Sequence, residues 1–136
     1  MRQLDHAIKV ALAAHDGQID KIGRPYFEHC RRVALAVSGD DAKSVAYLHD
    51  VVEKSSGWTL ERLAQDGFSQ TVVSAVDALT RWADETDDAY VRRAASNRLA
   101  LPVKQADLED NLWQVYQTGG DADKYRHGLA ILREYR

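Results

Sequence analysis

Cysteine and long apolar runs are scarce in this chain. Cys30 is the only cysteine among 136 residues, which excludes an internal disulfide and fits a reducing compartment. Its expected role is that of a small buried side chain. The amphipathic start, MRQLDHAIKVALAAHDGQ, is interrupted by charge and so lacks the apolar core of a signal peptide or a membrane span. These absences predict a soluble, cytoplasmic protein without a membrane partner.

The chain also lacks an excess of basic residues. It has 18 Lys and Arg against 21 Asp and Glu, a formal net charge of -3. Polynucleotide binding normally needs a basic surplus, so a polynucleotide partner is disfavoured, although a local basic pocket is not. At 136 residues the chain is expected to form one domain, residues 1–136, with a real hydrophobic core.

Convincing strand patterns are missing, and apolar residues recur at helical spacing almost throughout. Asp40, Thr59 and Ser69 are typical N-cap residues, and Pro25 and Pro102 suit the first turn of a helix. The pattern predicts an all-α, single-domain, multi-helix fold. Its expected helices span residues 4–12, 25–37, 40–52, 59–64, 69–82, 90–95 and 102–118, with a last helix from 122 onward.

The segment YLHDVVEKSS, residues 47–56, places charged side chains among small apolar residues. On a continuous helix His49 and Glu53 are four residues apart, and Asp50 and Glu53 are three apart, so all three can face one cavity. The alternative is the solvated side of an ordinary amphipathic helix.

A second polar stripe lies in VKQADLEDN, where Lys104, Asp107 and Asn111 fall at i, i+3 and i+7. Its alternative is an exposed stripe with a helical ion pair between Lys104 and Asp107 or Glu109. His29, after Pro25, adds another imidazole. Histidine and carboxylate together suit a divalent first-row metal such as manganese, iron or zinc.

The order of these motifs resembles a known family. AAHDGQ, GRPYFEH, AYLHDVVEK, VDALTR and VKQADLEDN together resemble the HD-domain metal-dependent phosphohydrolases. More narrowly, they resemble the hydrolase domain of RelA/SpoT-type alarmone enzymes of the stringent response and their small stand-alone relatives. The resemblance runs from about Ala7 to Asn111. Those relatives are all-helical, bind one manganese ion and remove the 3′-pyrophosphate from guanosine tetra- and pentaphosphate.

The resemblance implies a role for each motif residue. It makes one Mn²⁺ ion the expected cofactor and Glu53 the residue that orients or deprotonates the attacking water. The implied metal ligands are His29, His49, Asp50 and Asp107, and the residues that contact the nucleotide or support the site are Lys21, Tyr90, Lys104 and Asn111. Taken from the residues alone, Lys21 is equally a solvated loop lysine, Asn111 a helix–helix hydrogen-bonding residue and Tyr90 a core aromatic.

Three positions depart from the family pattern. Asp20 stands where an arginine commonly packs on guanine, Cys30 where a proline follows the first histidine, and Lys54 where the catalytic pair has its second acidic residue. Lys54 can hold a phosphate oxygen at this catalytic position, or it can pair with Asp50 at i+4. His15 is expected to pack or cap, because its spacing does not provide a second metal site.

These patterns predict a metal-dependent hydrolase of a small phosphorylated nucleotide. The expected activity resembles that of a guanosine-3′,5′-bis(diphosphate) 3′-pyrophosphohydrolase, with weakened guanine recognition because Asp20 and Lys54 reverse two charges. The alternatives are a metal- and nucleotide-binding module with little hydrolysis, a phosphohydrolase of a different nucleotide, and a structural helical bundle without metal.

Overall fold

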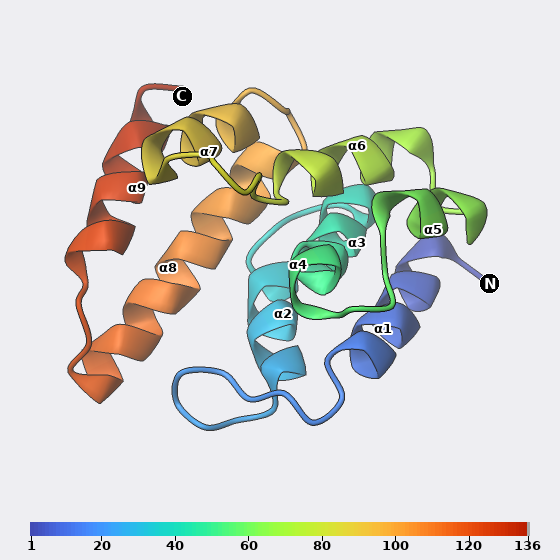
Figure 1. Cartoon of the computed structure of the whole chain (residues 1–136), viewed down its shortest axis with the longest axis horizontal. Helices are drawn as coiled ribbons and strands as arrows, with labels where there is room; N and C mark the ends of the chain where they lie inside the picture. Colours follow the sequence, from blue (N-terminus) through green and yellow to red (C-terminus); the bar gives the residue numbers. More distant parts are fainter. Residues whose placement is uncertain (136) are drawn as a thin grey trace.

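The computed structural model describes residues 1–135 and is built from α-helices. Within that range, an isolated bridge between Ile19 and Pro25 is the one β feature, so the predicted all-α class is confirmed. The helices, shown in Figure 1, are α1 (Gln3–Ala14), α2 (Tyr26–Leu35), α3 (Asp40–Leu48), α4 (Val51–Lys54), α5 (Leu60–Gln65), α6 (Gln70–Ala78), α7 (Asp87–Ala95), α8 (Ala100–Thr118) and α9 (Asp123–Arg133).

The long helix α8 lies between two groups of helices. It packs against α2, α3 and α6 on one side and against α7 and α9 on the other, and it crosses Figure 1 diagonally between the two groups. The larger apolar core fills the first group and includes Val33, Leu48 and Val76. A smaller cluster on the other side includes Val91, Leu108 and Ile131. Polar side chains of α8 therefore lie at the junction between two apolar regions.

The predicted helix 40–52 is two helices. Asp40 is the first residue of α3 and the N-cap is Gly39, whose φ of 92° suits glycine, so the N-cap prediction was one residue off. At the other end α3 stops at Leu48, and Asp50 leaves helical geometry with φ -107° and ψ 0°. His49 Nδ1 lies 2.5 Å from the Ala46 carbonyl oxygen, which a continuous helix would offer to the Asp50 amide. The helix is thus interrupted at His49 and Asp50, the two adjacent polar residues of this segment.

Other helix ends follow the local signals. Thr59 Oγ1 and Ser69 Oγ accept hydrogen bonds from backbone amides in the first turns of α5 and α6, as expected of N-caps. The helix expected near residues 90–95 begins earlier, at Asp87, because the Thr86 side chain caps it by accepting from the Ala89 amide.

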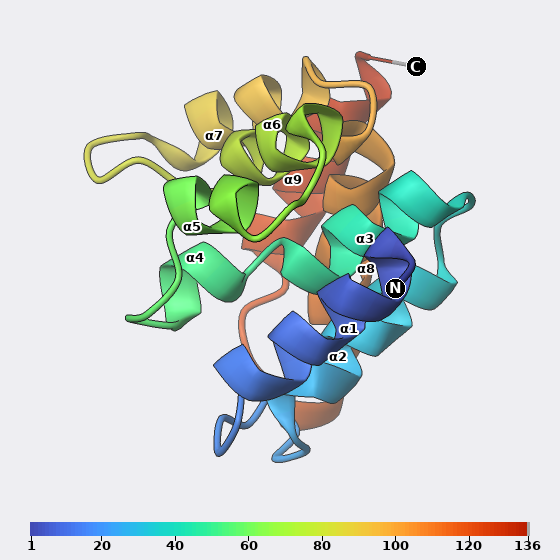
Figure 2. The same cartoon turned by 90° about the vertical axis from the view of Figure 1, so that its right-hand side faces the viewer.

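Seen from the side in Figure 2, α4 and α5 lie on the same edge as the connection into α7. No helix within residues 1–135 is long and apolar enough to cross a membrane.

Candidate metal centre

Four side chains from three segments converge on one point. His29 lies on α2, His49 and Asp50 lie between α3 and α4, and Asp107 lies on α8. Each offers one ligand atom, and these atoms lie within 4.8 Å of one another. His29 Nε2 is 3.0 Å from Asp107 Oδ1, and His49 Nε2 is 3.0 Å from Asp50 Oδ2. The structure therefore brings together the four residues that the resemblance implies as ligands.

The outer nitrogens of both imidazoles face acceptors. His29 Nδ1 lies 2.6 Å from Asp110 Oδ2, and His49 Nδ1 lies 2.5 Å from the Ala46 carbonyl oxygen. Because a carbonyl oxygen can only accept, the His49 Nδ1 carries the proton and donates it. The ionised Asp110 carboxylate favours the same arrangement at His29. With the proton kept on Nδ1, each Nε2 that gives up its own proton can offer its lone pair to a cation, which is the usual arrangement of metal-binding histidines.

The charged states of the cluster residues are stabilised by the opposite charges of their neighbours. Burial alone would lower the pKa of His49, but the Asp50 and Asp107 carboxylates raise it to about 10. Burial alone would raise the pKa of Asp107, but the Lys104 ammonium and the two imidazoles keep it well below its usual range. Two buried carboxylates therefore stay anionic only with positive charge beside them, and a divalent cation supplies such charge.

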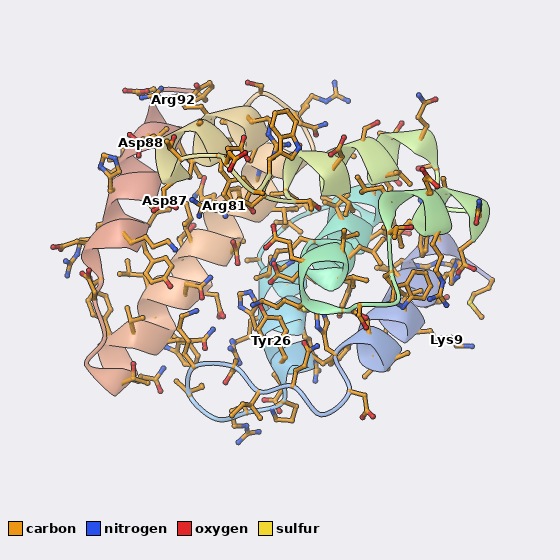
Figure 3. The ribbon with its side chains drawn as sticks, in the orientation of Figure 1. Lys9, Tyr26, Arg81, Asp87, Asp88 and Arg92 are labelled. Carbon is orange, nitrogen blue, oxygen red and sulfur yellow. The ribbon has the colours of Figure 1, made fainter. Side chains whose placement is uncertain are left out.

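A cavity of about 290 Å³ opens over the cluster. Asp50 and Asp107 reach its wall, whereas His29 and His49 are each 1% exposed and lie beneath it. Every other residue that the sequence assigned to the site lines this cavity: Lys21, Glu53, Lys54, Tyr90, Lys104 and Asn111. In Figure 3, Tyr26 lies near the lower end of α2, Asp87 and Asp88 lie in the first turn of α7, and Arg81 lies near them. Tyr26, Arg81 and Asp87 line the cavity as well, so its wall extends from α2 to α7.

Glu53 and Lys54 lie on α4 at the cavity wall. Glu53 Oε1 accepts a hydrogen bond of 2.5 Å from the Arg81 amide, and partial burial raises the pKa of Glu53 above its ordinary value. The Lys54 Nζ lies 5.1 Å from the centre of the Tyr26 ring. No ion pair joins Lys54 to Asp50 in the described part of the chain, although they are four residues apart. The ion-pair alternative for Lys54 is therefore wrong in this structure.

Lys104 and Asp107 are not an exposed stripe. Their exposed fractions are 6% and 7%, and Lys104 Nζ lies 3.1 Å from Asp107 Oδ2. The ion pair considered from the sequence thus exists, but it is buried beside the cluster. Lys104 Nζ also lies 4.3 Å from the centre of the Tyr90 ring, and the Tyr90 hydroxyl donates a hydrogen bond to the Leu79 carbonyl. Tyr90 is therefore a cavity residue that is also anchored to the core.

Lys21 and Asn111 form a bridge to the cluster. Lys21 Nζ donates to Asn111 Oδ1 at 2.5 Å, and Asn111 Nδ2 donates to Asp107 Oδ1 at 3.0 Å. Lys21 is an exposed loop lysine, as one of the alternatives expected, but its ammonium is held at the cavity wall by Asn111. Asn111 does contact a neighbouring segment, but that segment is the loop before α2.

Asp20 points away from the cavity. It is 7% exposed, its Oδ1 accepts from the Ile22 and Arg24 amides, and its Oδ2 pairs with Arg32 at 2.9 Å. The charge reversal expected at position 20 therefore does not reach the cavity wall, because the carboxylate is buried and paired with Arg32. His15 and Cys30 are buried, as expected, and His15 Nδ1 is hydrogen-bonded to Gln18 Oε1.

The sequence reading missed two groups of residues. The first group lies behind His29 rather than in the cavity and consists of Asp110, Arg32 and Gln114. A signal for two of them was present in the sequence: Asp110 follows Asp107 by three residues and Arg32 follows His29 by three, and this spacing places each pair on one helix face. The second group lines the far wall of the cavity on α9, where no motif drew attention: Lys124, Tyr125, His127, Gly128 and Ile131.

Comparison with solved structures identifies the architecture. The chain matches the structure of a metazoan ortholog of SpoT, a protein that hydrolyzes ppGpp and plays a role in starvation responses. The TM-score is 0.77, and the match covers 99% of this chain and 84% of that chain. The two chains share one fold. It is the all-α HD-domain fold that the sequence predicts.

The sequences of these two chains are 21% identical, so the likeness establishes the fold. The sequence of this chain matches no protein-family model and no curated protein. What the chain does therefore has to be argued from its own residues.

Proposed function

We propose that the chain is a Mn²⁺-dependent phosphohydrolase that removes pyrophosphate from the 3′ position of guanosine 3′,5′-bis(diphosphate) or a closely related nucleotide. The observation that carries the proposal is the cluster of His29, His49, Asp50 and Asp107 beneath a cavity whose wall includes several lysines as well as acidic residues. The shared fold with a protein that hydrolyzes ppGpp supports it. The single buried cysteine fits a cytoplasmic enzyme.

The donor set fits a manganese ion. Two imidazole nitrogens and two carboxylate oxygens suit borderline-to-hard divalent cations, and both imidazoles have their outer nitrogens paired. When bound there, the ion would lower the pKa of a water molecule and neutralise phosphate charge. Iron and zinc accept similar donors, so the choice of manganese rests on the resemblance in the sequence.

The chain's own residues supply the remaining chemistry. Water adds to the phosphorus next to the ribose 3′-oxygen, the bond between these two atoms breaks, and pyrophosphate leaves while the 3′-oxygen takes a proton. Glu53, at the cavity wall, accepts the proton of the attacking water. The Arg81 amide, hydrogen-bonded to Glu53 Oε1, fixes the direction of that carboxylate.

Cationic and amide groups around the cavity hold the substrate. Lys21 and Lys54 present ammonium groups to phosphate oxygens, while Lys104, paired with Asp107, supports the cluster from the cavity side. Asn111 orients Lys21, and Tyr90 closes the wall beside Lys104. A cavity of about 290 Å³ fits part of one small nucleotide, which agrees with a small-molecule substrate rather than a polynucleotide.

A second candidate function is a metal- and nucleotide-binding module that hydrolyses slowly. Lys54 favours it, because this position carries the second acidic residue of the catalytic pair in the resembling family. In this structure Lys54 lies beside Tyr26 at the cavity wall and provides no base.

A turnover screen separates the two functions. Phosphate and pyrophosphate release is measured with Mn²⁺ and with a chelator, for guanosine 3′,5′-bis(diphosphate), its adenine counterpart and both 3′-monophosphate analogues. Manganese-dependent pyrophosphate release supports the hydrolase. Manganese-dependent nucleotide binding without release supports the binding module, and the absence of any Mn²⁺ binding overturns both.

A further inference from the structure

A network of polar side chains lies behind His29, on the side away from the cavity. The side chains of Asp20 and Asp110 are 1% and 9% exposed and Gln114 is buried, whereas the Arg32 side chain is 26% exposed. The centre of the network is Asp110, whose Oδ2 lies 2.6 Å from His29 Nδ1. Arg32 approaches the same carboxylate through Nε, 2.7 Å from Oδ1, and through a terminal nitrogen, 3.2 Å from Oδ2. Gln114 Nε2 adds a hydrogen bond of 2.9 Å to Oδ2. The Asp110 carboxylate thus has donors on both oxygens, which fixes its plane relative to the imidazole.

The network continues from Arg32 to the loop before α2. The same guanidinium donates to Asp20 Oδ2 at 2.9 Å. The Asp20 side chain is 1% exposed, so its charge depends on this partner and on the loop amides that bind Oδ1. One arginine therefore joins two carboxylates from segments that are 90 residues apart in the chain.

The loop is tied to α8 a second time, next to Asp20. The Lys21 amide donates to Gln114 Oε1 at 2.8 Å, and Gln114 in turn donates to Asp110. Asp20, Arg32, Asp110, Gln114 and the Lys21 backbone therefore close a ring. The Lys21 ammonium extends from this ring into the cavity, where Asn111 holds it.

We propose that Asp20, Arg32, Asp110 and Gln114 are positioning residues that hold His29 and the Lys21 loop as one unit. On this proposal Asp20 contributes to metal binding and to the placement of Lys21, and takes no part in recognition of a base. The proposal rests on the metal-dependent function proposed above. It gives a physical reason for an aspartate at a position where the resembling family has an arginine.

The network pairs two nearly buried carboxylates, those of Asp20 and Asp110, with the partly exposed guanidinium of Arg32. Removing one carboxylate leaves the Arg32 guanidinium, which is 26% exposed, with one anchor instead of two, and its relaxation displaces whatever it was holding. Loss of the Asp110 carboxylate releases His29 directly. Loss of the Asp20 carboxylate releases Arg32, and a shift of Arg32 then displaces the Asp110 carboxylate that holds His29. Groups behind a ligand imidazole typically change metal affinity about 10- to 100-fold.

The first test measures Mn²⁺ affinity of the full chain by titration calorimetry. Asp110→Asn should weaken Mn²⁺ binding by about 10- to 100-fold, and Asp20→Asn by about 10-fold, the lower end of that range. Asp16→Asn is the matched control, because Asp16 lies in the same connection between α1 and α2 but is exposed and outside the ring. If Asp20→Asn and Asp16→Asn bind Mn²⁺ as tightly as the wild type, the link from Asp20 to the cluster is refuted.

Asp20→Arg separates positioning from base recognition. It restores the residue type of the resembling family, so a base-binding role predicts a lower KM for guanine nucleotides. A positioning role predicts weaker Mn²⁺ binding and a higher KM, because the new arginine would place its guanidinium group against that of Arg32. A lower KM with unchanged Mn²⁺ affinity overturns the proposal. Asp20→Asn carries the test if Asp20→Arg does not fold.

A spectroscopic measurement distinguishes positioning from general loosening of the fold. With diamagnetic Zn²⁺ bound, the proton on His29 Nδ1 should give a hydrogen-bonded imidazole signal in ¹H–¹⁵N NMR spectra of the wild type. Asp110→Asn should shift this signal, while the signal of His49, bonded to the Ala46 carbonyl, stays in place. Equal shifts of both signals would refute a specific role of Asp110. A wild type that binds no metal would instead refute the proposed function.

Discussion

At the residue scale, the cluster depends on what surrounds each ligand. The Asp107 carboxylate, which is the ligand contributed by α8, contacts four other side chains: His29, His49, Lys104 and Asn111. Its ionised state is maintained mainly by Lys104 and the imidazoles, against the effect of burial. Its loss therefore removes a ligand and leaves buried cations without their partner.

Asp107→Ala should abolish most metal binding while the helices remain. The expected result is a steep fall in bound Mn²⁺ per chain, measured by elemental analysis after dialysis, with little change in far-ultraviolet circular dichroism. Glu109→Ala provides the control, because Glu109 is exposed on the same helix. Metal content equal to that of the wild type in Asp107→Ala would show that the four residues do not form the site.

Glu53→Gln should separate chemistry from metal binding. The amide preserves the shape of the side chain but cannot accept a proton from water, and loss of a positioned general base typically costs about 10²- to 10⁴-fold in rate. Bound Mn²⁺ should remain at the wild-type level, because Glu53 is outside the four-residue cluster. The measurement is kcat for the best substrate of the screen, with Glu61→Gln, exposed on α5, as control. Full turnover in Glu53→Gln would place water activation elsewhere.

At the element scale, sequence periodicity predicted the helices better than it predicted how they end. Caps at Thr59 and Ser69 were readable, because a side-chain oxygen acts on amides within three residues. The break between α3 and α4 was not, because it lies where Asp50 leaves helical geometry and His49 contacts Asp107 on the distant α8. The pairing of Asp20 with Arg32 could not be predicted for the same reason, since it is set by the path of the loop. Contacts between segments that are distant in the chain cannot be predicted from the local spacing of residues.

The packing of α9 on α8 gives an element-scale prediction. A Cβ built on Gly128 lies 3.0 Å and 3.2 Å from the Leu108 methyl carbons, so the Leu108 side chain has to shift to admit a larger residue there. Gly128→Val should lower the free energy of unfolding by about 1–3 kcal/mol, as overpacked substitutions do, measured by urea denaturation. Ala130→Val, exposed on the same helix, controls for β-branching. Equal stability of the two variants would show that α9 adjusts its position freely.

At the scale of the whole molecule, the cluster joins elements that belong to different parts of the chain. His29 is on α2, His49 and Asp50 flank the α3–α4 break, and Asp107 is on α8, which lies between the two apolar clusters. Unfolding of any one of these elements separates the ligands. A cation that binds the cluster should therefore stabilise the larger core and α8 together.

Mn²⁺ should accordingly raise the melting temperature of the wild type. A ligand that binds only the folded state at 100 times its Kd adds about 2.7 kcal/mol, which for a chain of this size corresponds to a shift on the order of 10 °C. Differential scanning calorimetry at increasing Mn²⁺ should show a progressive rise that a chelator reverses. Asp107→Ala should show no rise, whereas Glu109→Ala should follow the wild type. If Asp107→Ala gained as much stability from Mn²⁺ as the wild type, the ion would be binding somewhere other than the junction of α2, α3 and α8.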